Sequence, residues 1–286
     1  MRVAILGMGA IGHVVARALE GRCDLVRVDR TRAPLREGEP AVRAAVVCVK
    51  TFGTEWAADA AARILAPDGV AVTIQNGLGN VEALAARLGE ERVSGGVIYV
   101  GAALRPDGSL FATGPGRVEL GRPRASGPAS ALEELGRALA DGGMTVTVVD
   151  DPWPSIWRKV AVNAAMNPTT ALFSCTNGEL LDHPAGRPLA DELAREVARV
   201  AMAAGVGISE EEVLAAWQGV ARTLGDNRSS MLQDVSAGRR TEIDAICGAV
   251  AREGERRGVP TPLCEAVTIL VEALGEREAA ASPVTA

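Results

Sequence analysis

The chain has 286 residues, enough for about two domains that each bury a core of their own. Hydrophobic residues make up 48% and charged residues 23% of it, a balance that excludes a disordered chain and a collagen. Its 30 basic and 36 acidic residues give a net charge of −6, so it lacks the basic character that non-specific nucleic-acid binding needs.

The first half of the chain alternates short apolar runs with patterns of helical period. The runs predict strands at 3–6, 24–28, 44–49 and 70–74. The helical patterns predict helices at 11–19, 57–65 and 81–88, the second of them ended by Pro67-Asp68-Gly69. This order of strands and helices predicts a parallel sheet covered by helices.

The pattern changes after residue 97 and again after Pro152. Short β-like runs between 97 and 120, separated by turns rich in proline and glycine, predict antiparallel strands that finish the same sheet. A last strand is expected at 145–149, and helices are expected at 155–165, 189–204, 209–224, 241–257 and 263–274. We therefore expect an α/β N-terminal domain over residues 1–152 and an all-α C-terminal domain over residues 153–286.

A glycine-rich turn, Gly7-Met8-Gly9-Ala10-Ile11-Gly12, follows the first expected strand and opens the first expected helix. In such a turn the first glycine permits a tight bend, the second lets the backbone approach a pyrophosphate, and the third lets the helix pack on the strand. The phosphates then face free N–H groups at the helix N-terminus. These six residues are predicted to bind a dinucleotide, with a glycine turn that has no ligand as the alternative.

The end of the second expected strand carries opposing signals about which dinucleotide is bound. Asp29 lies about 20 residues after Gly9, where an acid binds the ribose 2′-hydroxyl of NAD. Arg30, with Arg32 nearby, can instead pair with the 2′-phosphate of NADP. A solvated strand end is a third interpretation, and these residues leave the choice open.

Polar residues also stand at the carboxyl ends of the expected strands, where ligands lie in an open α/β sheet. Lys50 follows the strand at 44–49, and Asn76 opens the turn Asn76-Gly77-Leu78-Gly79. A plain turn is the structural alternative for Asn76.

The helix expected from residue 155 carries polar residues among apolar ones. Lys159 and Asn163 are one turn apart on the same face, which indicates a polar stripe that faces a cleft. A surface lysine that reaches solvent is the alternative for Lys159, and a helix cap is the alternative for Asn167, because Pro168 follows it.

Three later segments have a structural and a functional interpretation. Ser230 and Gln233 are spaced as a capping box, and a hydroxyl at a helix start also suits a substrate carboxylate. Glu242 is expected in the first turn of the helix at 241–257, as a helix-start acid or a substrate contact, and Asn177 stands in a turn with the same ambiguity. His13 is expected to be structural, so a histidine-based dehydrogenase is not expected.

These segments, in this order, resemble the ketopantoate reductase (2-dehydropantoate 2-reductase) family over nearly the whole chain. The resemblance rests on the glycine turn, Asn76–Gly79, Trp157-Arg158-Lys159 with Asn163 and Asn167-Pro168, Asn177-Gly178-Glu179-Leu180, and Ser229-Ser230-Met231-Leu232-Gln233-Asp234 followed by Thr241-Glu242-Ile243-Asp244. The glycine turn is shared by many families, whereas the Lys–Asn helix and the last block are far more specific.

The resemblance implies a doubly wound Rossmann-type domain that binds the dinucleotide, a helical domain that binds the substrate, and an active site between them. It implies NADPH-dependent reduction of ketopantoate, a small 2-oxo acid, to pantoate on the way to pantothenate and coenzyme A. By position it implies the following roles: catalysis by Lys159, the proton donor, and Glu242; cofactor binding by Gly7, Met8, Gly9, Ala10, Ile11, Gly12, Arg30, Lys50 and Asn76; substrate binding by Asn76, Asn163, Asn167, Asn177 and Ser230. Asp29 departs from the pattern of the family, because a carboxylate repels a phosphate, and it keeps NAD(H) open.

Two alternative functions follow from the same residues. A relative that acts on another 2-oxo or 2-hydroxy acid with NAD(H) is favoured by Asp29. A non-catalytic NADP(H) sensor is disfavoured by the set Lys159, Asn163, Ser230 and Glu242, which a sensor does not need.

The remaining expectations concern compartment and partners. No apolar run reaches the roughly 18 residues of a membrane helix, so we expect no membrane partner. The five cysteines and two histidines show no metal-binding or disulfide spacing, so we expect no metal and a reducing, cytoplasmic compartment. A homodimer is left open.

Overall fold

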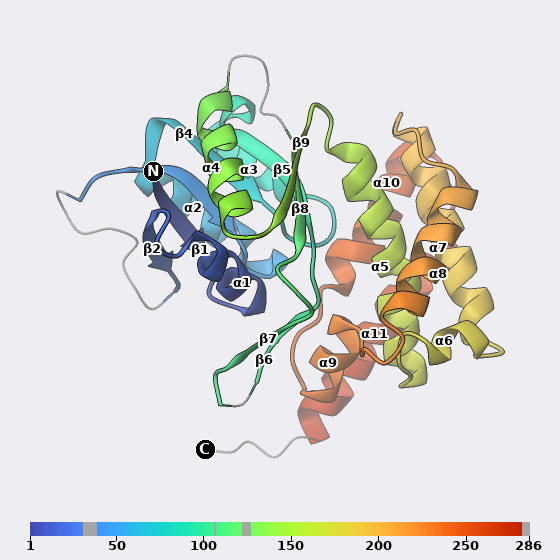
Figure 1. The fold of residues 1–286 in the computed structure, drawn as a ribbon. Helices are drawn as coiled ribbons and strands as arrows, with labels where there is room; N and C mark the ends of the chain where they lie inside the picture. Colours follow the sequence, from blue (N-terminus) through green and yellow to red (C-terminus); the bar gives the residue numbers. More distant parts are fainter. Residues whose placement is uncertain (31–38, 106, 122–126, 282–286) are drawn as a thin grey trace. The chain divides into compact units, whose positions relative to one another are not determined.

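The computed structural model describes residues 1–30, 39–105, 107–121 and 127–281, with the side chains described as far as residue 277 (Figure 1). Contacts divide the chain into two compact units. The first consists of residues 1–75 and 79–155, and the second of residues 76–78 together with the chain from residue 156 onward. The chain therefore enters the second unit briefly at Asn76, returns at Gly79, and enters it again at Ile156.

The first unit is built on one large sheet. Seven strands of its described residues follow the order β2-β1-β3-β4-β5-β8-β9. They are β1 (Arg2–Leu6), β2 (Asp24–Val28), β3 (Val42–Val47), β4 (Leu65–Thr73), β5 (Val93–Tyr99), β8 (Arg117–Gly121) and β9 (Thr145–Val149). The strands β1 to β5 are parallel, β8 runs antiparallel to β5, and β9 runs parallel to β8.

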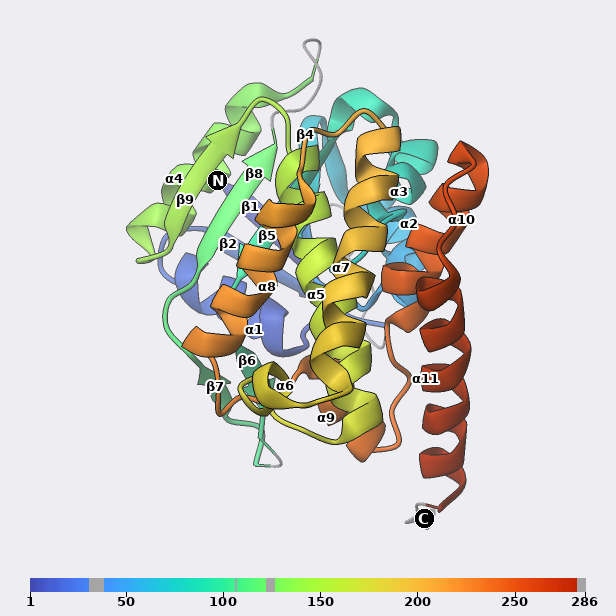
Figure 2. The same ribbon diagram turned by 90° about the vertical axis from the view of Figure 1, so that its right-hand side faces the viewer.

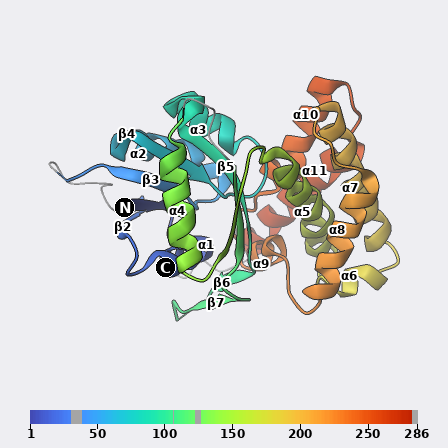
Figure 3. The same cartoon turned by 45° about the horizontal axis from the view of Figure 1, so that its top comes forward.

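Helices bury both faces of this sheet (Figure 3). Along β1, Val3 and Ile5 pack with α1 (Ala10–Leu19) and α4 (Ala129–Asp141), because successive strand residues point to opposite faces. Ala4 and Leu6 pack on the other side with α2 (Thr54–Ile64) and α3 (Asn80–Leu88). A strand that is apolar on both faces suits only a sheet covered on both sides, and the predicted doubly wound α/β fold is confirmed.

Four local expectations for this unit need correction. The strands β6 (Ala102–Leu104) and β7 (Leu110–Ala112) pair only with each other, as a hairpin closed by the bond from Gly108 N to Arg105 O, so β8 and β9, without them, finish the main sheet. Residues 67–69 do not separate helix from strand but form an irregularity within β4, where the pairing register with β3 shifts. The helix α4 was not expected, and α2 begins at Thr54, after the short 3₁₀ turn η1 (Thr51–Gly53).

The described residues of the second unit form helices joined by turns and loops, and no strand, as predicted (Figure 2). Its elements are α5 (Trp153–Phe173), whose first turn lies in the first unit, α6 (Glu179–Asp182), α7 (Gly186–Ala203), α8 (Glu210–Thr223), α9 (Ser230–Ser236), the π-helical turn η3 (Asp244–Gly248), α10 (Ala249–Arg257) and α11 (Pro262–Ala281). Among the described helices of the whole chain, none combines the length and the apolar character needed to span a bilayer.

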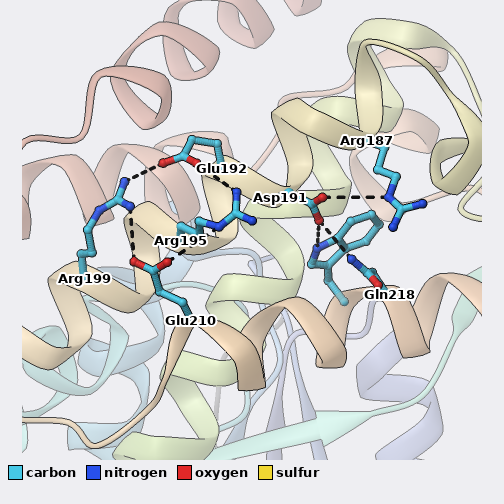
Figure 4. Close-up of polar contacts among 8 residues, drawn as sticks. Arg187, Asp191, Glu192, Arg195, Arg199, Glu210 and Gln218 are labelled. Carbon is cyan, nitrogen blue, oxygen red and sulfur yellow. Dashed lines mark hydrogen bonds and ion pairs between the residues drawn. The ribbon is translucent and has the colours of Figure 1, made fainter.

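Polar contacts fix α7 against its neighbours (Figure 4). Asp191 accepts hydrogen bonds from the indole of the fully buried Trp217, at 3.0 Å, and from Gln218, at 3.2 Å, both on α8. On the next turn, Arg195 and Arg199 bridge Glu192 to Glu210. Between these two arginines in the sequence, the buried Glu196 accepts bonds from the backbone N–H groups of Leu263 and Cys264 at the start of α11. These contacts tie α7 to α8 and to the start of α11.

Candidate active site

In the glycine turn, two glycines are needed for packing and one leaves open space for a ligand. A Cβ on Gly7 (φ +102°) would lie 2.7 Å from the backbone N of Val49, and a Cβ on Gly12 would lie 2.0 Å from the carbonyl oxygen of Gly7, so both positions require glycine for packing. A Cβ on Gly9 would meet nothing within 4 Å in the described chain, and Gly9 is the N-terminal flank of α1. Space beside a helix N-terminus fits a pyrophosphate. Met8 and Ile11 pack against the α1 face of the core, and Ala10 begins the helix.

The residues that bear on the choice of cofactor lie just after β2. Asp29 is half-buried and Arg30 is exposed. The Nη2 atom of Arg30 lies 3.6 Å from the position that a Cβ on Gly53 would take, so its guanidinium points toward η1. Lys50 is half-buried and flanks the start of the same turn. Arg32 lies outside the described residues.

In the second unit, three of the predicted residues form a hydrogen-bonded chain. The amide Nδ2 of Asn76 donates to Glu242 Oε2 at 3.1 Å, and the Nδ2 of Asn163 approaches Asn76 Oδ1 at 3.5 Å. Lys159 lies one turn before Asn163 on α5, and the charge of Glu242 acts on it. The fold thus gathers residues that are up to 166 positions apart in the sequence.

The environment of Lys159 changes its acidity. Although the side chain as a whole is only half-buried, loss of solvent around the ammonium lowers the pKa of Lys159 to about 8, and the carboxylate of Glu242 opposes that shift. An unperturbed lysine has a pKa near 10.4. The site therefore holds an ammonium that is protonated at neutral pH and releases its proton easily, as a general acid must.

Backbone contacts hold Asn76 against η3. The N–H of Leu78 donates to the carbonyl of Ala245 at 2.9 Å. Gly77 has a φ of +78°, and a Cβ on it would lie 2.3 Å from the same carbonyl oxygen, so no other residue fits. Glu242 lies just before the helical segment rather than in its first turn as expected, and that segment includes the π-helical turn η3. Turns of this kind are rare in proteins, and those that occur are often found at functional sites.

The three remaining predicted residues lie in the same unit. Asn167 is buried inside α5, which continues through Pro168, so it is not a helix cap. Asn177 is buried, donates to the carbonyl of Leu224 at 3.2 Å, and has an Oδ1 atom with no hydrogen-bond partner among the described residues. A buried amide oxygen without a partner is costly, which is typical of a site that a ligand completes.

The capping box expected at Ser230 and Gln233 is wrong by one residue. Ser229 caps α9: its Oγ accepts from Leu232 N at 3.1 Å and from the hydroxyl of Thr170 at 2.7 Å. Gln233 donates instead to the carbonyl of Arg228. Ser230 is exposed, and no hydrogen bond among the described residues uses its hydroxyl.

Sequence reasoning missed three polar residues in the first unit, Thr54, Gln75 and Asn80, which bond one another beside the ends of β3 and β4. The sequence held a signal for two of them, because Gln75 and Asn80 are polar residues that flank the turn Asn76–Gly79. No group of three or more histidine, cysteine or acidic residues in the described chain could hold a metal ion.

The family models and the named relatives agree with one another. A family model described as "Ketopantoate reductase PanE/ApbA" matches residues 34–125, and one described as "Ketopantoate reductase PanE/ApbA C terminal" matches residues 152–275. A relative from Halobacterium salinarum named 2-dehydropantoate 2-reductase is 34% identical over 97% of this chain and 100% of its own.

Two solved structures are similar over almost their full length. One is 2-dehydropantoate 2-reductase from Geobacter metallireducens, with a TM-score of 0.83 and 27% identity over 96% of this chain and 99% of that one. The other is D-mandelate dehydrogenase in complex with NADH, with a TM-score of 0.87 and 26% identity over 97% and 99%.

Proposed function

The chain belongs to the ketopantoate reductase family, whose members are nicotinamide-dependent oxidoreductases that act on CH–OH groups, and from this premise we propose that it reduces 2-dehydropantoate to pantoate. The observation that carries the proposal is the cluster of Lys159, Asn163, Asn76 and Glu242 within one unit. The substrate class is a small 2-oxo acid that bears a hydroxyl group.

The first unit is proposed to bind the dinucleotide, NADP(H) in the first instance. The turn Gly7–Gly12 would hold the pyrophosphate, since Gly9 leaves open space beside the N-terminus of α1. Arg30 would pair with the 2′-phosphate, and Lys50 and Asn76 would flank the nicotinamide half. When bound in its reduced form, this cofactor supplies a hydride to the 2-oxo carbon.

Lys159 is proposed as the proton donor. The ketone oxygen gains negative charge as its carbon is reduced, and the ammonium stabilises that charge before it gives up a proton. A pKa near 8 brings the donor close to working pH. General acids of this kind contribute roughly 10²- to 10⁴-fold to the rate.

The substrate is proposed to lie against the polar residues of the second unit. The hydroxyl of Ser230 would bind the carboxylate. Asn163, Asn167 and Asn177, with Asn76 and Glu242, would bind the hydroxyl end, and the Oδ1 atom of Asn177 has a vacant acceptor position for it. Sites built to bond a hydroxyl discriminate strongly against analogues that lack it.

The predicted domains, 1–152 for the dinucleotide and 153–286 for substrate and catalysis, are proposed with one amendment. Asn76–Leu78 belongs with the second unit, although the flanking residues belong with the first. The loop after β4 therefore supplies Asn76 to the substrate unit.

One alternative function has an observation in its favour. A reaction on another 2-oxo or 2-hydroxy acid with NAD(H) is supported by Asp29 and by the similarity to D-mandelate dehydrogenase, whose structure holds NADH. An NADP(H) sensor without catalysis has no such support, because it needs no set of the kind formed by Lys159, Asn163, Ser230 and Glu242.

The test is a turnover assay with the purified protein, 2-dehydropantoate, and NADPH or NADH in parallel, read by loss of reduced-cofactor absorbance. We expect oxidation of NADPH. Oxidation of NADH alone would reverse the cofactor assignment, and turnover only on other 2-oxo or 2-hydroxy acids would establish the alternative. Gly9→Ala is the control: it meets no steric conflict, so it should fold normally but bind cofactor poorly.

A further inference from the structure

Three polar residues of the first unit form a hydrogen-bonded cluster between two loops. Thr54 is the first residue of α2, Asn80 is the first residue of α3, and Gln75 ends the stretch that follows β4. The amide Nε2 of Gln75 donates to Thr54 Oγ1 at 2.9 Å, and Thr54 Oγ1 donates to Asn80 Oδ1 at 2.9 Å. We refer to these three residues as the Thr54 clamp.

The Thr54 hydroxyl is the hub of this clamp because it accepts one bond and donates another. A hydroxyl has a single proton, so its contact at 2.8 Å with the carbonyl of Thr51 competes with the bond to Asn80. Thr54 and Asn80 are only 4% and 6% exposed, so water cannot readily replace these partners. Thr73 holds the far side of Gln75, through a bond from its hydroxyl to Gln75 Oε1.

The clamp fixes both ends of the loop Asn76–Gly79. Gln75 directly precedes that loop, Asn80 directly follows it, and the loop itself has two glycines with positive φ. Gln75 Nε2 also donates to the carbonyl of Val49, the residue before Lys50, at 2.9 Å. The amide of Gln75, which directly precedes the Asn76 loop, is thus bonded to the residue that directly precedes Lys50 and η1, which together we call the Lys50 turn.

We propose that Thr54 is a positioning residue: it holds Gln75 and Asn80, the two residues that flank the Asn76 loop, and it lies outside the set of residues proposed to touch cofactor or substrate. The inference rests on the proposed roles of Lys50 and Asn76 beside the nicotinamide. Its physical basis is that Gly77 and Gly79 allow the loop more than one backbone shape, so the bonds at its two ends, together with the bond from Leu78 N to Ala245 O, select one. Small misplacements of reacting groups lower rates steeply.

A purely structural role is the competing explanation, since any lost buried hydrogen bond costs stability. The test therefore needs a variant that loses a matched bond elsewhere. Ser94 on β5 is 1% exposed, and its hydroxyl donates to the carbonyl of Gly121 at 2.6 Å. Ser94→Ala removes a buried hydroxyl bond from the same unit without touching the Asn76 loop.

The experiment compares Thr54→Val, Thr54→Ser and Ser94→Ala with the unaltered protein, by steady-state kinetics and by hydrogen exchange of the peptide that spans residues 75–80. We expect Thr54→Val to lower kcat about 10-fold, with faster exchange in that peptide. Thr54→Ser should restore both, and Ser94→Ala should lose stability but keep kcat and loop exchange. If Thr54→Val does not fold, Asn80→Ala breaks the same bond from the acceptor side and replaces it.

Two outcomes would overturn the proposal: a kcat for Thr54→Val no lower than that of Ser94→Ala, or unchanged exchange at 75–80. The exchange measurement needs no turnover. If the unaltered protein reduced no 2-oxo acid, the proposed function would fail while exchange still decided whether Thr54 holds the loop.

Discussion

At the scale of single residues, the protonation of Lys159 decides when the proposed proton transfer can occur. Burial lowers its pKa to about 8, against the opposing charge of Glu242. A proton donor must be protonated at the start of the reaction. We therefore expect the rate of ketone reduction to fall as the pH rises through about 8 and the ammonium is lost.

The interaction between Lys159 and Glu242 gives a second prediction. Glu242→Gln removes the negative charge that raises the pKa of Lys159, so that pKa falls further and the alkaline limb of the rate profile moves to lower pH. The measurement is kcat against pH for both proteins. Glu265→Gln, at an exposed position on α11, is the matched control and should leave the limb in place. An unmoved limb in Glu242→Gln would separate Glu242 from the titration of Lys159.

At the scale of elements, the loop between β4 and α3 contains two glycines with the same kind of backbone conformation but different surroundings. Gly77 and Gly79 share a positive φ, +78° and +86°, so alanine is strained at both. Only Gly77 faces the carbonyl of Ala245, 2.3 Å from the position of its Cβ, whereas Gly79 has nothing within 4 Å in the described chain.

We expect Gly77→Ala to displace Asn76 from Glu242 and to cost at least 10-fold in kcat/KM, because the collision is with backbone that cannot rotate away. Gly79→Ala pays the conformational cost alone, about 1 kcal/mol of stability, and should keep most activity. Parallel kinetics and thermal unfolding separate the two effects. Equal losses of activity in both variants would show that the contact with Ala245 does not matter.

The same elements show what the sequence could and could not predict. The elements β1, α1, β2 and β9 were predicted closely, since apolar period and flanking glycines fix them locally. The helix α5 passes Pro168 because the apolar residues on both sides of the proline are buried, a tertiary gain that outweighs the lost N–H bond.

In the candidate site, too, local patterns predicted some features, and contacts between distant residues decided the others. The shared face of Lys159 and Asn163 follows from helical period alone. The bond between Asn76 and Glu242 joins distant residues, so no local pattern could give it, and only the family resemblance brought them together. Ser229 and Ser230 are identical in type, and the choice between them depended on Thr170, a partner from another helix.

At the scale of the whole molecule, the chain crosses between its two units at three points, after Gln75, after Leu78 and after Ser155. The first directly precedes the Asn76 loop, the second lies within that loop before Gly79, and the third lies within the continuous helix α5. Each unit has its own buried core and its own share of the proposed contacts. Each ligand should therefore stabilise mainly the unit that binds it.

This division predicts separable patterns of protection from hydrogen exchange. A ligand that binds only the folded form stabilises it by RT ln(1 + [L]/Kd), about 2.7 kcal/mol at a hundredfold excess over Kd. Cofactor alone should slow exchange in β1, the glycine turn, α1 and the Lys50 turn. Substrate alone should slow it in α5, in η3 and around Asn177 and Ser230.

The variant Gly9→Ala provides the internal control for this measurement. This variant should lose the protection that cofactor gives to the first unit and keep the protection that substrate gives to the second. The added methyl group fills only the space that is proposed for the pyrophosphate. Protection of α5 and η3 by cofactor alone, undiminished in Gly9→Ala, would contradict the assignment of the dinucleotide to the first unit. It would point to the helical unit as the primary site for both ligands, and the glycine turn would then be a structural bend.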